Sequence, residues 1–214
     1  MKTSGHTNFQ IIFDSLKEFD LLLESDAKLP SVAGLISGEP VRGSWWGHAR
    51  AQQIFTVLQQ LADHNDVLIA KLVSGKVTFV HRKLWPEVVS LGQAREPWQV
   101  RNLSPAAKML LEQIDHHGSL LTNALEWSSK FKSIKPGEAV RDLEKRLLIH
   151  SEEFHTGEGA HAKQIETWEH WKRRIGFKGK PVSIESAKRK LEKRIEVLNE
   201  RFEASGKMPW TKIS

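Results

Sequence analysis

Histidine and glutamate side chains gather in one stretch of this 214-residue chain, where they could bind a metal. Four histidines fall within 21 residues, and glutamates lie among them: His150, His155, His161 and His170, alongside Glu152, Glu153, Glu158 and Glu166. Imidazole and carboxylate groups bind zinc and iron. The spacing, however, is not HExxH or another familiar metal-binding pattern. We therefore expect solvated or hydrogen-bonded histidines, with no metal and no cofactor.

Other catalytic patterns are absent from the sequence. The chain has no cysteine, which excludes disulfides, thiolate zinc sites, iron–sulfur clusters and cysteine nucleophiles. It has no glycine-rich phosphate loop, no G-x-S-x-G motif and no dinucleotide fingerprint. On these grounds, whether the protein is an enzyme stays open.

The positive charge of the chain is concentrated toward its C-terminal end. The formal net charge is +6. Residues 172–214 hold 13 Lys and Arg against 5 Asp and Glu, whereas residues 1–171 carry a net charge of −2. Such asymmetry indicates contact with nucleic acid or another acidic surface. If nucleic acid is bound, the C-terminal segment is expected to supply most of the attraction.

Hydrophobic periodicity divides the first half of the chain into helices and one hairpin. Apolar residues recur every three or four positions in the helices, and Ser74-Gly75 separates two short apolar runs. With this two-residue turn, Leu68 would face His81. The expected elements are helices at 8–24, 31–37, 44–62 and 84–90, strands at 67–73 and 76–81, and a loop at 93–102 that separates two units.

The second half begins with a strong helix signal, because Ser104 can cap a helix and Pro105 suits its first position. The stretch 148–167 is ambiguous. Its apolar spacing allows a helix, but the Gly157-Glu158-Gly159 turn and the β-branched residues favour a hairpin, which we predict. In that hairpin His150 and His155 would point to opposite faces. The remaining expected helices are 104–118, 120–127, 138–147, 168–175 and 184–202.

The order helix, helix, helix, hairpin occurs twice, at 31–82 and 104–167, and this order is the outline of a winged helix. We therefore predict a helix-rich α+β fold with two winged-helix-like units followed by a basic C-terminal helix. The expected domains are 1–92, 103–176 and 183–203. In such units the third helix commonly enters the DNA major groove. The second unit fits this better, with 138–146 as its third helix, although winged helices also serve as protein–protein modules.

Three segments resemble sequences of small bacterial proteins related to the AlkZ-type DNA glycosylases: GSWWGHARAQQIF, LVSGKVTFVHRKLWPEVV, and the stretch from LSPAAKMLLEQI to AHAKQIETW. The resemblance implies tandem winged helices and an activity that removes alkylated or crosslinked bases from DNA. The family also has a β-barrel, for which this chain lacks room. Its catalytic signature is Gln–apolar–Gln or Gln–apolar–Asp. The nearest match is Gln164-Ile165-Glu166, which makes Gln164 and Glu166 the candidate catalytic residues.

Basic and aromatic residues supply the candidate nucleic-acid contacts. A ring beside an arginine can stack on an exposed base, and a basic helix can follow the phosphate backbone. The candidates are Arg42, Trp46, His81, Arg82, Lys83, Arg141, Lys145, Arg146, Arg173, Arg174, Lys188, Arg189, Lys193 and Arg194. The adjacent Trp45 and Trp46 could instead be a core anchor and a surface anchor. The mixed charges of the last helix could simply be solvated.

The sequence thus favours a DNA-binding protein of winged-helix type, acting in repair or regulation. One alternative is a glycosylase-like repair enzyme. Another is a non-catalytic adaptor that forms a homodimer through the apolar seam of Ile184–Phe202. No run of about 18 apolar residues is present, and the first residues do not form a secretory signal. We expect a cytoplasmic protein with DNA as its partner and no membrane contact.

Overall fold

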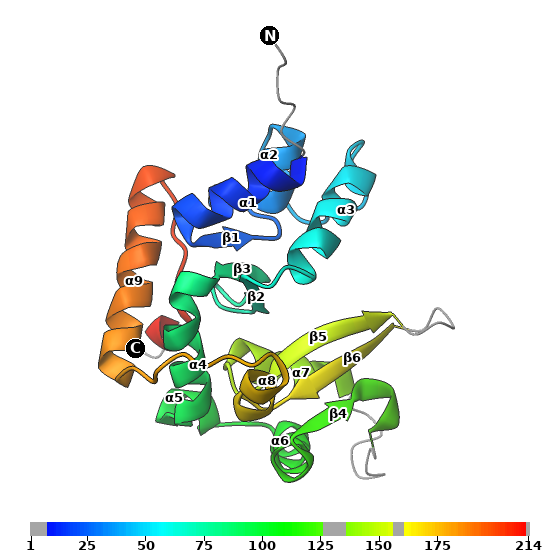
Figure 1. Cartoon of the computed structure of the whole chain (residues 1–214), viewed down its shortest axis with the longest axis vertical. Helices are drawn as coiled ribbons and strands as arrows, with labels where there is room; N and C mark the ends of the chain where they lie inside the picture. The colour runs from blue at the N-terminus through cyan, green and yellow to red at the C-terminus, as the bar shows by residue number, and fades with distance from the viewer. Residues whose placement is uncertain (1–7, 126–135, 156–160, 213–214) are drawn as a thin grey trace. The chain divides into compact units, whose positions relative to one another are not determined.

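The computed structural model describes residues 8–125, 136–155 and 161–212, which fold into two compact units (Figure 1). Unit 1 consists of Met1–Trp85 and Arg189–Met208, and unit 2 of Pro86–Lys188 and Pro209–Ser214. Each unit contains one three-stranded antiparallel sheet with helices around it. The predicted helix-rich α+β fold is thereby confirmed.

Unit 1 begins with a helix and a strand, followed by two helices and a hairpin. Its elements are α1 (Asn8–Phe19), β1 (Leu21–Leu23), α2 (Val32–Ser37), α3 (Ala51–Ala62), β2 (Val67–Ala70), β3 (Thr78–His81) and the 3₁₀ turn η1 (Arg82–Leu84). The strand order is β1-β3-β2, so the third strand lies in the middle. Ile12 and Leu16 of α1 and Ile54 of α3 are buried in its core.

Two helix boundaries predicted for unit 1 are wrong. The predicted helix 8–24 ends at Phe19, because Asp20 adopts a left-handed conformation with φ 58° and Leu21–Leu23 then pairs with β3. The predicted helix 44–62 starts only at Ala51. Trp45 lies in the turns before it, buried, with its indole N–H donating to Glu24 Oε1 over 2.7 Å.

The first hairpin is confirmed, but its predicted register is wrong by one residue. Leu68 faces Val80 and not His81. The connection is longer than a two-residue turn, because Ala70 pairs with Thr78 and both Ser74 and Gly75 have positive φ angles. All four residues of β3 are buried, so hydrophobic alternation gave no guide to the register.

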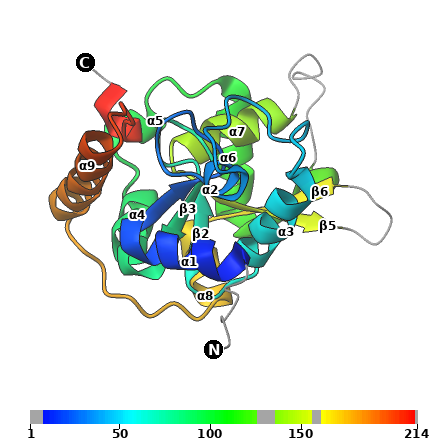
Figure 2. The ribbon, with the colours of Figure 1, turned by 90° about the horizontal axis from the view of Figure 1, so that it is seen from above.

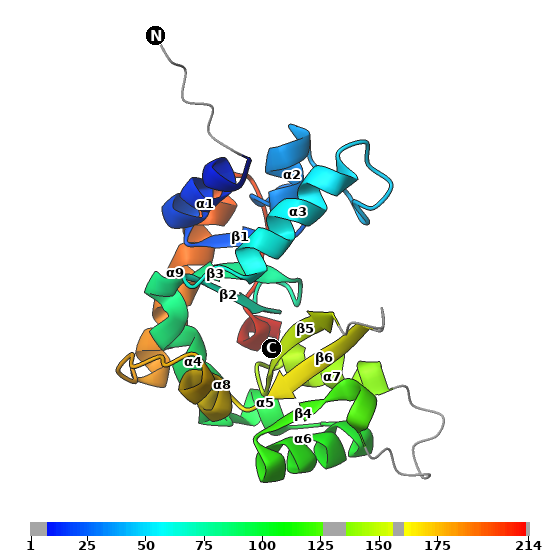
Figure 3. The same cartoon turned by 45° about the vertical axis from the view of Figure 1, so that its right-hand side comes forward.

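After two further helices, unit 2 contains a helix, a strand, a helix and a hairpin, which within the described residues is one α-helix fewer than in unit 1 (Figure 3). Its elements are α4 (Trp85–Ala94), α5 (Pro97–Val100), α6 (Pro105–His117), β4 (Ser119–Leu121), η2 (Thr122–Ala124), α7 (Pro136–Lys145), β5 (His150–His155), β6 (His161–Glu166), α8 (Trp168–Arg174) and η4 (Pro209–Lys212). The strand order is β4-β6-β5, again with the third strand in the middle. Side chains of α6 and α7 pack with Ile165 of β6 in one core.

The predicted hairpin at 148–167 is confirmed as β5 and β6. In its register His150 pairs with Glu166 and His155 with His161. The predicted helix 120–127 is wrong, since Ser119–Leu121 pairs with β6 as a strand; residues 126 and 127 lie outside the described part.

The polar stretch 93–102 is not a plain loop. It contains the end of α4 and the short helix α5, with Pro97 in its first turn and a reciprocal cap between Glu96 and Gln99. The Gln99 side chain is fully buried and donates to the carbonyls of Leu91 and Arg146. The stretch is therefore a packed part of unit 2.

The last helix, α9 (Ile184–Arg201), is confirmed and follows a long irregular link after α8 (Figure 2). Leu191, Ile195 and Leu198 are buried within unit 1. Phe202, just after the helix, contacts Phe19 edge-on at 5.5 Å between ring centroids. The apolar seam that could have formed a dimer is thus covered by the chain itself.

Gly92 lies within α4, against the indole of Trp168, so this helix continues past the predicted end at residue 90. A Cβ at this position would be 2.3 Å from Trp168 Nε1, which donates to Leu147 O over 2.7 Å. We expect Gly92→Ala to lower the free energy of unfolding by about 1–3 kcal/mol, as overpacked cores do. Urea unfolding measures this change.

Gly137→Ala in α7 is the matched control for this substitution. An added Cβ there meets no described atom within 4 Å. We expect it to be neutral or to stabilise the protein by about 0.4–1 kcal/mol, because alanine restricts the unfolded chain. Equal stability of the two variants would contradict the close packing of Gly92 against Trp168.

Candidate functional site

A buried carboxylate lies at the end of β6 in unit 2. Glu166 is fully buried, and three side chains surround it. His150, its neighbour across β5, places Nδ1 3.2 Å from Glu166 Oε1. From α8, His170 Nδ1 lies 2.6 Å from Oε2, and Arg174 Nη2 donates to Oε1 over 2.6 Å. We call these four residues the Glu166 cluster.

The pKa of Glu166 reflects this arrangement. Burial is the largest influence and by itself raises the pKa of the carboxyl group. Hydrogen bonds from His150, Arg174 and His170 oppose it and together lower the pKa from 4.5 to about 2. Glu166 is therefore ionised at neutral pH, and the hydrogen bonds make it the anion that holds β5, β6 and α8 together.

Gln164 lies two residues before Glu166, so both side chains occupy the same face of β6 while Ile165 enters the core. Its Nε2 donates to Ser119 Oγ of β4 over 3.0 Å. The structure thus brings the two candidate catalytic residues onto one polar sheet face. It also gives every Glu166 oxygen a protein partner, so in this conformation its role is to position its neighbours.

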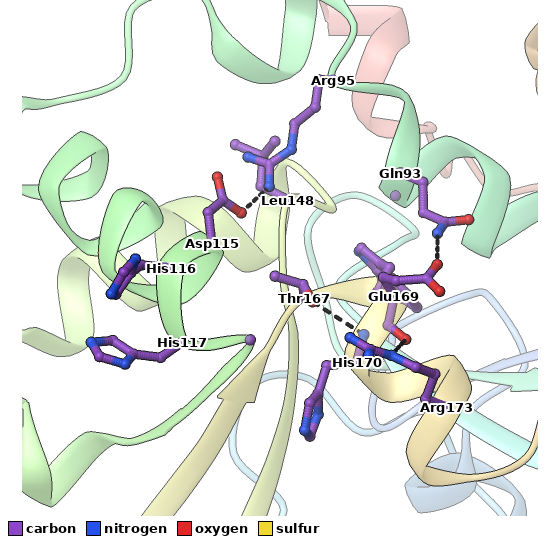
Figure 4. Close-up of a pocket in the computed structure, with 13 residues that line it drawn as sticks. Gln93, Arg95, Asp115, His116, His117, Leu148, Thr167, Glu169, His170 and Arg173 are labelled. Atoms are coloured by element: carbon purple, nitrogen blue, oxygen red, sulfur yellow. Dashed lines mark hydrogen bonds and ion pairs between the residues drawn. The ribbon is translucent and has the colours of Figure 1, made fainter.

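An open pocket of about 610 Å³ lies in unit 2, beside the cluster (Figure 4). His170 lines it and also contacts Glu166, so its ring connects the pocket with the buried carboxylate. Arg95 and Asp115 form an ion pair on its wall, with Nη2 2.5 Å from Oδ1. His116 and His117, the last two residues of α6, also line the pocket. This group was not predicted from the sequence, although two histidines directly before a helix-ending glycine were a visible signal.

The candidate contacts at the start of unit 1 divide into exposed and buried groups. Arg42 is exposed, and the Trp46 side chain is 64% exposed. His81 is buried, and burial together with the nearby Lys83 charge lowers its pKa, which favours a neutral ring. Arg82 pairs with Asp66 at 3.3 Å, and Lys83 lies 3.6 Å from the buried Asp20. Arg82 and Lys83 are thus more than half exposed, but each lies near a carboxylate of its own unit.

The candidates of α7 and α8 divide in the same way. Arg141 and Lys145 are exposed on α7. Arg146 forms an ion pair with Asp142. It also donates hydrogen bonds to the carbonyls of residues 98, 99 and 101, which connect the end of α7 with α5 and the residues around it. Arg173 lines the pocket, whereas Arg174 is held by Glu152 and Glu166.

The basic helix α9 uses much of its charge internally. Lys188 pairs with Glu96 at 2.7 Å, and Arg194 pairs with the buried Asp20. Arg189 and Lys193 are exposed. The net charge of the C-terminal segment therefore overstates the charge that α9 offers to a partner, because ion pairs neutralise part of it.

The described residues hold no group of three or more His, Asp or Glu side chains arranged to bind a metal ion. Nor does the described part of the chain contain a helix that is long and apolar enough to cross a membrane.

Comparison with known proteins gives one family. The family model described as AlkZ related matches residues 12–206, which include every element from α2 to α9. No curated protein and no solved structure matches the chain.

Proposed function

Because the chain belongs to the AlkZ-related family, which associates it with DNA repair, we propose that it binds duplex DNA through two winged-helix units. The observation that carries the proposal is the repeated topology. Unit 1 has the order α1-β1-α2-α3-β2-β3. Within its described residues unit 2 has the order α6-β4-α7-β5-β6, which is the same order with one α-helix fewer between the first strand and the hairpin. Both sheets place the third strand between the first and the second. This strand order supports the proposal of winged helices, in which the helix before the hairpin commonly enters the major groove.

Under this proposal, phosphates would be contacted by the exposed basic residues that form no ion pair within the described residues. Arg141 and Lys145 are exposed on α7, the helix directly before the hairpin of unit 2. Arg189 and Lys193 are exposed on α9. Residues such as Arg146 and Arg174, by contrast, would have to leave carboxylate partners before they could bind phosphate.

The proposal is tested with the full chain and a duplex oligonucleotide over a range of salt concentrations. Affinity is expected to fall linearly with salt on logarithmic axes, because phosphate contacts release counterions. The double variant Arg141→Gln, Lys145→Gln is expected to weaken binding and to reduce the salt slope by about one for each phosphate that is no longer neutralised. Fluorescence anisotropy measures both quantities.

Lys17→Gln on α1 is the matched control, because Lys17 is exposed but lies 2.5 Å from Asp14. It should change the salt slope less than either residue of the pair on α7. A wild-type protein without measurable affinity for duplex DNA at low salt would refute the proposed function.

Glycosylase activity is the second candidate, supported by the shared sheet face of Gln164 and Glu166 and the pocket that adjoins it. A carboxylate can stabilise an oxocarbenium-like sugar or activate a water when the glycosidic bond breaks. Glu166 would first have to exchange at least one of its protein partners for substrate.

Release of free base from alkylated duplex DNA tests this second candidate. Gln164→Ala is the informative variant, because Gln164 is only half-buried and makes one side-chain hydrogen bond to Ser119. Loss of about tenfold or more in the release rate, with an unchanged melting temperature, would support catalysis. No base release by the wild-type protein would leave the chain as a non-catalytic DNA-binding protein.

A further inference from the structure

The outward face of α3 carries four glutamines and no charge. Ala51–Ala62 contains no Lys, Arg, Asp or Glu. Its Ile54, Val57 and Leu61 are buried in unit 1. The exposed residues of the opposite face are Gln52, Gln53, Thr56, Gln59 and Gln60. At 3.6 residues per turn these five positions fall within an arc of about 120°, so they form one continuous surface. We call it the glutamine face.

A face of this composition differs from an ordinary solvated helix. Helix surfaces that only meet water commonly carry alternating acidic and basic residues. The exposed side of α9 does so, with Lys193 and Glu196 among its exposed residues. Glutamine offers both a donor and an acceptor and can bind adenine N7 and N6 together in the major groove. It also introduces no carboxylate that phosphates would repel.

The N-terminal border of the glutamine face is basic and aromatic, whereas the exposed Asp63 follows its C-terminal end. Arg50 directly precedes α3, and Arg42 lies in the preceding loop; within the described residues neither is paired with a carboxylate. Trp46 stacks on Trp45 at 4.1 Å and contacts Phe55 of α3 at 5.7 Å, which holds its exposed ring against the helix. Unpaired positive charge at the rim of an acid-free helix is complementary to the sugar–phosphate backbone on either side of a groove.

We propose that the glutamine face of α3 reads base edges in the major groove of duplex DNA, with a preference for sites that contain adenine. The inference rests on the proposed function, and it assigns base reading to unit 1. The predicted reading helix, α7 of unit 2, has acidic residues among its exposed and half-exposed positions, including Glu138 and Asp142. Its basic residues are suited to phosphates, so the two units would divide backbone contact and base contact.

The experiment places carboxylates on the glutamine face of the full-length protein. In Gln52→Glu, Gln53→Glu the new charges lie in the first turn of α3, where acidic groups interact favourably with the helix dipole. The variant is therefore expected to fold at least as well as the wild type. Its affinity for a mixed-sequence duplex is expected to fall by about tenfold or more, because each carboxylate would face phosphates and acceptor atoms.

Gln113→Glu on α6 is the control, since it makes the same chemical change on a half-buried residue of unit 2. Its affinity for DNA should remain within about twofold of the wild type. Base preference is measured separately by competition between duplexes rich in A·T and in G·C. Gln53→Ala should reduce the wild-type preference for A·T by about fivefold or more.

The outcomes separate the inference from the proposed function. Unchanged DNA affinity in the double variant, while the wild type binds DNA, would overturn the role of α3 and leave DNA binding intact. Equal wild-type affinity for A·T-rich and G·C-rich duplexes would also overturn base reading by α3. If the wild type binds no DNA, both ideas fail together. Loss of affinity in the double variant but not in Gln113→Glu supports the glutamine face as the contact surface.

Discussion

Glu166→Ala is expected to lower the free energy of unfolding by about 1–3 kcal/mol, because it leaves the buried His150 without its hydrogen-bond partner. His150 is buried beside Glu166, and Arg174 makes three hydrogen bonds to its carboxylate. Removing the carboxylate costs more than its hydrogen bond to His150 contributes, since the His150 ring stays buried without a partner. Urea unfolding followed by circular dichroism measures the change.

Glu152→Ala is the matched control, because Glu152 binds the same Arg174 nitrogen over 2.7 Å but has a side chain that is 38% exposed. An exposed ion pair contributes about 0–1 kcal/mol. The two substitutions remove carboxylates that bind the same arginine, so the difference between their effects on stability measures the contribution of burial. Similar losses of stability in both variants would show that the burial of Glu166 does not determine its contribution.

The pH dependence of the same carboxylate has a definite sign. The pKa of Glu166 is about 2 in the folded chain and 4.5 without the surrounding structure, so the folded state favours the ionised form. The stabilisation is complete above pH 4.5 and is lost as the pH falls toward 2. Glu166→Gln should flatten the acid limb of a stability–pH curve in that range. A limb as steep as that of the wild type would contradict the lowered pKa.

Leu191→Ala is expected to lower the free energy of unfolding by about 2–5 kcal/mol, the usual cost of removing a buried leucine side chain. Leu191 is fully buried in unit 1, so the substitution should lower the stability of the single chain. It should not change an association between two chains. Thermal unfolding measures the stability, and light scattering measures the mass of the folded species.

Val197→Ala on the same helix is the control, since the Val197 side chain is 45% exposed. It should change stability by less than about 0.5 kcal/mol. The adaptor hypothesis expects a different result: a wild-type dimer that Leu191→Ala converts to a folded monomer. A monomeric wild type that loses stability in Leu191→Ala would exclude dimerisation through the α9 seam.

Local signals in the sequence were sufficient for most helices and for both hairpins. Ser104 does cap α6, with its Oγ accepting from the amide of Ala107, and Gly118 ends the helix with a positive φ. The near-heptad apolar stripe of α9 is buried as its spacing indicated. In these cases a single segment contains both the apolar face of the helix and the residues that cap its ends. Such a helix can be predicted without knowing which distant residues it packs against.

The strands β1 and β4 could not be predicted because distant partners create them. Leu21–Leu23 follows α1 without a break in apolar spacing, and only pairing with Thr78–Val80 makes it extended. Ser119–Leu121 becomes a strand through Gln164–Glu166, more than 40 residues later. Three residues are too few for an alternating pattern to appear. Pairing with distant strands therefore determines the conformation of these two segments, which their own apolar spacing does not.

The candidate site was predicted in part. His150, Glu166 and His170 were noticed as a group of chemically capable residues, and the structure does bring them together, although around a carboxylate and not around a metal site. Arg174 was expected to meet nucleic acid and instead binds this carboxylate. The sequence does not indicate which carboxylate a basic residue will bind. Arg174 comes close to Glu166, eight positions earlier, only when α8 packs against the end of β6.

The division of unit 1 between two distant segments sets an order for folding during synthesis. Protein chains emerge at about 5–20 residues per second, and N-terminal domains generally fold first. Unit 1 cannot bury Phe19 completely until Arg189–Met208 has been made, because Phe202 packs against its ring. The roughly 100 intervening residues impose a wait of about 5–20 seconds at that rate, during which apolar surface stays open to chaperones. The sheet of unit 2, encoded entirely between these segments, is complete before the unit that begins the chain.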